Sequence, residues 1–242
     1  MPAINLAPSI LFSIGPWHIT TTFILQIIVS LLIIWIFVYT VRHWKTVPGK
    51  FQLLVETLVK FAYNQVDKVT NDPVRTHKIF PLIFTFFIFI MISNLFTLVP
   101  GMGAIFVRTS TQDISLFRSV LADYSMVLVL TMIVIVLSQV LFIFYNGFRK
   151  YFHKWFNFSS PMAFALGIMD IISEFAKILS LSFRLFGNVF AGEVLAIVIG
   201  SLVPFFVPIP FLVLNIFSSV IQAYVFSLLA AIFINSTMEV VN

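Results

Sequence analysis

Residues 162–203 read MAFALGIMDIISEFAKILSLSFRLFGNVFAGEVLAIVIGSLV, a run dominated by apolar side chains and free of proline. As one α-helix this run would be about 63 Å long, which is about twice the hydrocarbon thickness of a bilayer. A hairpin is the alternative, but its tip would carry Lys177 and Arg184 to the outer side, against the positive-inside trend. The run therefore predicts one long helix that tilts strongly in the membrane.

The composition of the whole chain also indicates a membrane protein. Hydrophobic residues make up 60% and charged residues 10% of the 242 residues, whereas a soluble domain carries about 25% charged residues. Cysteine is absent, which excludes disulfides and thiolate metal sites and leaves the compartment open. Residues 1–17 lack a basic start and are broken by prolines, so they do not resemble a secretory signal. The net charge of +5 is attributed to cytoplasmic loops rather than to nucleic-acid binding.

Four further stretches are apolar and long enough to cross a bilayer, which takes about 20 residues. They are residues 19–41, 79–99, 125–145 and 211–237. Together with 162–203, they predict an all-α polytopic membrane protein with about five transmembrane crossings. We expect residues 1–242 to form a single membrane domain.

Basic residues orient these spans. No lysine or arginine precedes Arg42, whereas residues 42–78 carry seven: Arg42, Lys45, Lys50, Lys60, Lys68, Arg75 and Lys78. The positive-inside trend therefore predicts that 42–78 is a cytoplasmic loop, that 1–18 is an external N-terminal segment and that the C-terminus is cytoplasmic. The uncharged, proline-rich turn 204–210 is expected outside.

Part of the cytoplasmic loop has the pattern of an amphipathic helix, with apolar residues on one arc and polar residues on the other. The apolar arc holds Phe51, Leu54, Val55, Leu58, Phe61 and Ala62. A helix lying on the membrane surface fits this pattern, and so does an ordinary packing helix of the loop.

The polar residues of the long helix fall mainly on one stripe. With Arg184 at zero and about 100° per residue, six positions lie within about 40° of it. They are Asp170, Ser173, Lys177, Ser180, Asn188 and Ala191. Glu193 lies about 180° away and about 13 Å further along the axis, so it belongs to the opposite face.

Arg184 is the most informative residue of this stripe, because a charge at membrane depth costs about 3 kcal/mol or more and usually marks an ion pathway or a buried pair. Snorkelling to a headgroup or pairing with an internal acid would be a purely structural role. Glu193 is on the wrong face, and Asp170 is about 21 Å away along the helix. We therefore expect Arg184 to face outward, toward a carboxylate of another subunit. Glu174 and Lys177 are expected to pair with each other or with lipid.

The last span carries a second, shorter stripe. Its residues Asn215, Ser218, Ser219 and Gln222 follow the i, i+3, i+4, i+7 spacing of one helix face. Helix-to-helix hydrogen bonding is the commoner use of such residues in membranes, and a functional lining fits the pattern equally well.

Several runs of this chain closely resemble subunit a of bacterial and chloroplast F-type ATP synthases. They are SLSFRLFGNVFAGE at 180–193, SLVPFFVPIP at 201–210, IQAYVFSLLAAIF at 221–233 and FPLIFTFFIFIMISNLFTLVPG at 80–101. The resemblance implies a membrane stator with two offset proton half-channels beside a rotating ring of c subunits, each carrying one essential carboxylate. The implied partners are this c-subunit ring, the peripheral-stalk b subunits of the ATP synthase complex and the lipid bilayer. The resemblance implies no cofactor and no metal.

By motif position, the resemblance also implies roles for single residues. Arg184 matches the essential arginine that faces the ring, and Asn188 is its polar neighbour. Glu193 matches the acid of the half-channel open to the periplasmic or luminal side, and Gln222 the glutamine opposite the arginine on the last helix. Asn215 stands where some bacterial relatives have a histidine, and since an amide does not titrate, proton relay there would need water.

Physical chemistry agrees with the role implied for the arginine. A carboxylic acid in lipid stays protonated, whereas at about 4 Å from Arg184 its ionised form gains about 4 kcal/mol with an effective dielectric of 20. Arginine remains charged in a dry site, whereas lysine can lose its proton. The chain has no phosphate-binding loop, nucleophile motif or metal-ligand spacing, so we do not expect it to bind ATP or to be an enzyme on its own.

A secondary ion or solute transporter is the alternative class, although the internal repeats typical of that class are not visible. A haem or quinone subunit would need paired histidines at membrane depth. The histidines, His18, His43, His77 and His153, all fall at span ends or in loops. The expected location is a bacterial plasma membrane, with an organellar inner or thylakoid membrane as the alternative, and the proton is the default ion.

Overall fold

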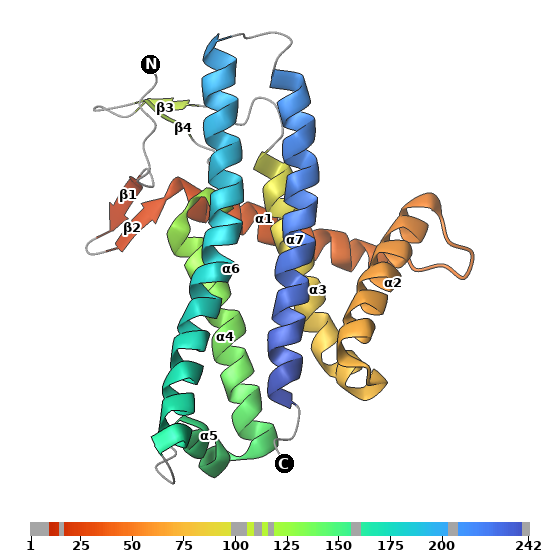
Figure 1. The fold of residues 1–242 in the computed structure, drawn as a ribbon. Helices are drawn as coiled ribbons and strands as arrows, with labels where there is room; N and C mark the ends of the chain where they lie inside the picture. The colour runs from red at the N-terminus through yellow and green to blue at the C-terminus, as the bar shows by residue number, and fades with distance from the viewer. Residues whose placement is uncertain are drawn as a thin grey trace.

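A computed structural model describes residues 10–14, 17–97, 106–108, 113–115, 119–155, 161–202 and 208–238. Its long helices are α1 (Thr21–Arg42), α2 (Lys50–Thr70), α3 (Pro73–Thr97), α4 (Tyr124–Asn146), α6 (Pro161–Leu202) and α7 (Pro208–Met238) (Figure 1). The shorter elements are the helix α5 (Phe148–Trp155), a 3-10 turn (Val120–Ala122) and the strands β1 (Ile10–Ile14), β2 (Trp17–Thr20), β3 (Phe106–Arg108) and β4 (Asp113–Ser115). The strands form two small antiparallel hairpins. The fold is therefore helical, as predicted, with short strands only at its periphery.

Five of the described helices, α1, α3, α4, α6 and α7, are long and apolar enough to cross a membrane. They lie where the sequence predicts spans, although α3 begins at Pro73, six residues before the predicted start. Residues 98, 99 and 203 of the predicted spans lie outside the described residues. The predicted outer turn 204–210 is too long, because Pro208 already begins α7. Proline is well suited to the first turn of a helix, where its missing N–H would have no partner.

The predicted long helix is present as one continuous element, because α6 runs through 42 residues without a break. Helix α1 has 22 residues, about 33 Å, which just crosses a bilayer. In Figure 1 α1 passes across the bundle at a large angle to α6 and α7. At about 63 Å, α6 is longer than the hydrocarbon core of a bilayer is thick, and its tilt in the membrane stays a prediction.

The core of the bundle lies among α3, α4, α6 and α7, and α7 is its centre because it also contacts α2. Ile90, Val134, Leu185 and Phe226, one from each of these four helices, are fully buried. The rings of Phe86 on α3 and Phe226 on α7 meet edge to face with centroids 6.2 Å apart. This packing fixes which face each helix turns inward and which it leaves for lipid or a partner.

The outer surfaces of α1 and α2 are rich in apolar side chains. Trp35 on α1 is 65% exposed, as expected for a helix surrounded by lipid rather than water. On α2, Phe51 and Leu54 are exposed, whereas Leu58 and Val66 pack against the core. Helix α2 thus packs against the core toward its C-terminal end and leaves an apolar surface at its N-terminal end, and its position on the membrane surface stays a prediction.

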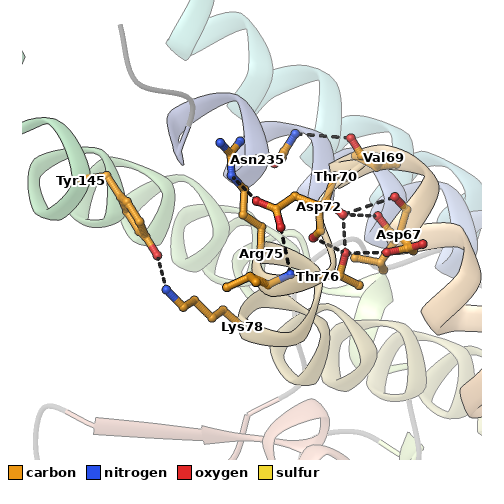
Figure 2. A network of polar contacts seen from close by, with 11 residues as sticks. Asp67, Val69, Thr70, Asp72, Arg75, Thr76, Lys78, Tyr145 and Asn235 are labelled. Carbon is orange, nitrogen blue, oxygen red and sulfur yellow. Dashed lines mark hydrogen bonds and ion pairs between the residues drawn. The ribbon is translucent and has the colours of Figure 1, made fainter.

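A polar network holds the turn between α2 and α3 (Figure 2). Asn71, in the left-handed conformation with φ of 48°, ends α2, and Asp72 forms an ion pair of 3.2 Å with Arg75. The hydroxyl of Thr76 at the start of α3 donates to Asp67 Oδ1 of α2 at 2.9 Å. It also shares a hydrogen bond with the hydroxyl of Thr70. These bonds satisfy polar groups at a helix end and set the angle between the two helices.

Two further contacts in Figure 2 tie this turn to the rest of the bundle. Asn235 Nδ2 of α7 donates to the carbonyl oxygen of Val69 at 3.3 Å, and Lys78 Nζ of α3 donates to the hydroxyl of Tyr145 on α4 at 3.3 Å. The ends of α2, α3, α4 and α7 at this side of the molecule are therefore joined by side-chain bonds as well as by packing.

Candidate functional site

The predicted polar stripe of α6 lies along an exposed edge of the helix. Ser173, Ser180, Arg184 and Ala191 are exposed, and Asp170, Lys177 and Asn188 are partly exposed. The opposite pattern holds for Leu181, Leu185 and Val189, which are buried against the bundle. The edge therefore carries mostly small and polar side chains, whereas a helix surface that faces only lipid is expected to be apolar.

Arg184 is the cation at the middle of this edge. Its side chain is exposed, although Leu185 beside it is fully buried. It makes no hydrogen bond or ion pair with any residue that the structure describes. An arginine uses five N–H donors when its bonds are satisfied. This one is therefore available to a partner outside the chain.

The other two charges in this part of α6, Glu174 and Lys177, bind each other. Lys177 Nζ lies 2.9 Å from Glu174 Oε1 and 5.3 Å from the ring centroid of Phe233 on α7. Burial, and secondly the charge of Glu174, raise the pKa of Tyr151 on α5. The expectation that Glu174 and Lys177 pair is confirmed, and the pair leaves Glu174 engaged with Lys177 rather than with Arg184.

Asn188 connects the two stripes, because its Oδ1 accepts a hydrogen bond from the hydroxyl of Ser218 on α7. Its Nδ2 is buried and has no hydrogen-bond partner among the described residues. Asn188 therefore belongs to the seam between α6 and α7 as well as to the edge that carries Arg184.

Asn215 is the second contact across this seam. A Cβ atom at Gly192 would lie 2.5 Å from both Oδ1 and Nδ2 of Asn215, so the Asn215 amide lies close against the backbone of α6 and would have to shift to admit a larger residue. The next residue, Glu193, is half-buried. The structure thus brings the predicted Asn215 of α7 beside the segment of α6 that carries the predicted acid.

We expect Gly192→Ala to destabilise the protein by about 1–3 kcal/mol, the usual cost of overpacking, because the new methyl group displaces the Asn215 amide. The thermal unfolding midpoint of the purified chain in detergent measures this effect. Gly187→Ala is the matched control on the same helix, since a Cβ there would meet nothing within 4 Å. Asn215→Ala should restore the stability of the Gly192 variant. Equal midpoints for the two alanine variants would contradict the close contact.

Gln222 lies deeper than the other predicted residues, with only 8% of its surface exposed. Its Nε2 has no hydrogen-bond partner among the described residues. The structure therefore places Asn188 and Asn215 at the seam between α6 and α7 and buries Gln222 on α7, whereas Arg184 stands on the exposed edge. No bond between Gln222 and Arg184 is present among the described residues.

Asn94 on α3 was missed from the sequence. It is 2% exposed, and neither of its amide atoms has a hydrogen-bond partner among the described residues. The available signal was an amide within an apolar span, which is rare enough to mark a functional position. Among the described residues, no group of three or more histidine, aspartate or glutamate side chains is placed to hold a metal ion.

Five apolar spans, a polar edge whose arginine has no partner among the described residues, and buried amide groups define an integral, multi-pass membrane protein with polar groups inside its membrane domain. The family model described as ATP synthase A chain matches residues 22–235, most of the chain. The chain therefore belongs to the ATP synthase A chain family.

Individual relatives agree with this assignment. The ATP synthase subunit a of Geotalea uraniireducens (strain Rf4) is 33% identical over 215 residues, which cover 88% of this chain and 85% of the relative. The subunit a of Legionella pneumophila (strain Corby) is 33% identical over 226 residues, 92% of this chain and 88% of the relative. That of Moorella thermoacetica (strain ATCC 39073 / JCM 9320) is 31% identical over 231 residues, 95% of this chain and 96% of the relative.

Proposed function

We propose that this chain is the membrane stator subunit of an F-type ATP synthase and that it couples proton movement to rotation of a ring of c subunits. Two offset half-channels, one open to each side of the membrane, lead protons to and from the ring. The observation that carries this proposal is the exposed Arg184, which has no partner among the described residues and stands on an edge of small and polar side chains. Membership of the family supports it.

Arg184 acts on the ring as a fixed charge. A ring carboxylate that approaches it to about 4 Å gains about 4 kcal/mol for its ionised form at an effective dielectric of 20. The carboxylate therefore releases its proton into one half-channel as it nears Arg184, and reloads from the other half-channel after it has passed. Because an arginine keeps its own proton, it blocks direct proton flow between the two half-channels. Small neighbours such as Ser180 and Ala191 leave room for the close approach of a partner helix.

The buried polar seam supplies the outer half-channel in this proposal. Glu193 is the acid that receives protons from the outer side, and Asn188 and Gln222 line the way between it and Arg184. Asn215, against Gly192, holds water beside Glu193 without titrating itself. The opposed faces of Glu193 and Arg184 on α6 keep the entrance apart from the gate.

The orientation of the chain in the membrane follows from where its charged and its exposed apolar side chains lie. The basic segment 42–78 lies in the cytoplasm, α2 lies at the membrane surface with Phe51 and Leu54 toward lipid, and the N-terminus lies outside. The peripheral-stalk b subunits complete the stator, and the membrane is the bacterial plasma membrane. ATP is bound and hydrolysed by other subunits, so this chain is not the catalytic one.

Isolation of the chain from its native membrane in mild detergent tests this proposal. We expect a small two-helix ring subunit and a soluble ATPase head to co-purify with it in constant proportion through size exclusion. Less complex should be recovered with the Gly192→Ala form of the chain than with the Gly187→Ala form. Recovery of the chain alone, with solute uptake when it is reconstituted into vesicles, would instead identify a transporter.

A further inference from the structure

A groove lies where α2, α3 and α7 meet, and its walls are mostly apolar. They include Phe61, Phe84, Tyr224 and Leu228. The open space of the groove, mouth included, is about 330 Å³, which is at the small end of the range for pockets that hold small molecules. Tyr224 lies about 160° from Gln222 around α7, so the groove is on the side of α7 away from the proposed proton path.

The groove is lined by helices of the membrane domain. Helices α3 and α7 are both long and apolar enough to cross a membrane, and Ile83 and Phe87 of α3 are buried in its wall. Phe61 of α2, whose ring centroid lies 6.1 Å from that of Tyr224, remains 49% exposed. An exposed aromatic ring beside two spans is better suited to hydrocarbon than to water. The groove therefore fits an occupant with a hydrocarbon chain.

One hydrogen-bond donor is available within these apolar walls. The hydroxyl of Tyr224 donates to Gln65 Oε1 at 3.2 Å, whereas Gln65 Nε2 makes no hydrogen bond among the described residues. The hydroxyl of Ser227, which also lines the groove, already donates to the carbonyl oxygen of Ala223 at 2.7 Å. Gln65 can therefore donate to an acceptor on the occupant, such as an ester carbonyl oxygen.

A positive charge stands at one end of the groove. Lys68 comes seven residues after Phe61, so it lies within about 20° of Phe61 around α2 and about 10 Å further along the axis. It is exposed and forms no ion pair among the described residues. This is the end at which Asn235 of α7 bonds to the carbonyl oxygen of Val69 on α2 (Figure 2).

The acids nearest to Lys68 in the sequence are engaged elsewhere. Asp67 accepts a hydrogen bond of 2.9 Å from the hydroxyl of Thr76, and Asp72 forms its ion pair of 3.2 Å with Arg75. The ammonium group of Lys68 is therefore free to attract an anion, and basic side chains beside a membrane attract anionic lipid headgroups.

We propose that this groove binds one anionic phospholipid, from the leaflet that meets the turn between α2 and α3. One acyl chain lies beside Phe61 and Tyr224, an ester carbonyl oxygen accepts a hydrogen bond from Gln65 Nε2, and the phosphate lies near Lys68. A phospholipid carries hydrocarbon, ester and phosphate in this same order. Gln65 and Lys68 are about 4.5 Å apart along α2, which suits an ester and a phosphate of one lipid. The bound lipid goes beyond the proposed function, and it joins α2 to α3 and α7.

Photolabelling of the intact complex tests this site. The complex is placed in phosphatidylcholine nanodiscs that contain a small amount of phosphatidylglycerol with a diazirine on one acyl chain. After illumination, mass spectrometry locates the label. The exposed face of α1 at residues 31–37 serves as the reference for ordinary lipid contact, because Leu31 and Trp35 are 61% and 65% exposed.

We expect several times more label on residues 61–66 and 224–228 than on residues 31–37. Unlabelled phosphatidylglycerol should compete with the label in the groove, and additional phosphatidylcholine should not. Equal labelling of the groove and of α1 would overturn the site. Equal competition by the two lipids would overturn the recognition of an anionic headgroup.

A pair of lysine variants tests the charge. Lys68→Gln keeps most of the side-chain length and removes the positive charge, so about fivefold more unlabelled phosphatidylglycerol should be needed to displace the label. Lys50→Gln is the matched control, because Lys50 is also an exposed lysine of α2 and lies eighteen residues before Lys68. Equal competition curves for the two variants would refute the role of Lys68.

Two filling variants test the groove itself. Ala62→Phe places a ring in the groove from α2, and Leu228→Trp does so from α7, so a folding defect in one variant leaves the other as a test. In a variant that assembles, label in the groove should fall to the level on α1, and label on α1 should not change. Undiminished labelling of the groove would overturn the proposal. These measurements do not follow proton movement, so their failure would leave the proposed function standing.

Discussion

Replacing Arg184 with alanine is expected to abolish ATP-driven proton pumping while ATP hydrolysis by the detached head continues. The exposed guanidinium has no partner among the described residues, so its loss leaves the fold intact and removes only the charge offered to the ring. Without about 4 kcal/mol of attraction, the population of the ionised ring carboxylate beside the stator falls by about a thousandfold. Quenching of a pH-sensitive dye in inverted membrane vesicles measures pumping, and phosphate release measures hydrolysis.

Two companion variants sharpen this test. Arg184→Lys keeps a positive charge but loses the planar fork of donors and can lose its proton in a dry site, so pumping should be severely reduced rather than preserved. Leu179→Ala changes an exposed apolar residue of α6 away from the polar edge and should pump normally. Pumping by Arg184→Ala at close to the rate of the unmodified protein would refute the assigned role.

Gln222→Leu is expected to lower proton flux about tenfold per assembled complex without lowering the amount of complex. A glutamine that only joins helices contributes about 0.6 kcal/mol through its hydrogen bonds, yet Nε2 of Gln222 has no such bond among the described residues. An unused donor in the buried seam is better suited to water or to the guanidinium of Arg184 during turnover. Replacing Gln222 with leucine leaves the guanidinium of Arg184 less well solvated.

Flux and assembly must be measured in the same membranes for this prediction. Ser227→Ala is the matched control, because Ser227 is also buried on α7 but its hydroxyl already donates to the carbonyl oxygen of Ala223 in the same helix at 2.7 Å. We expect Ser227→Ala to retain normal flux. Normal flux per complex in Gln222→Leu would leave Gln222 as a packing residue outside the proton path.

The sequence by itself determined the features that depend on local periodicity. Apolar runs longer than about 20 residues identify spans without knowledge of their neighbours, and α6 is continuous because nothing in it interrupts the helix. The polar stripe through Arg184 and the opposite placement of Glu193 follow from about 100° per residue alone. The pairing of Glu174 with Lys177 was predictable for the same reason, since it joins residues one turn apart.

Only the tertiary structure decided which faces meet. The fit of Asn215 against Gly192, the bond between Asn188 and Ser218, and the burial of Asn94 each depend on how separate helices are rotated toward one another. In a soluble helix the apolar face identifies the inside. In a membrane span the lipid-facing side is as apolar as the core, so association depends on close packing and interhelical hydrogen bonds between particular residues. Those contacts, rather than hydrophobicity, placed Asn188 and Asn215 between α6 and α7 and left Arg184 on the exposed edge.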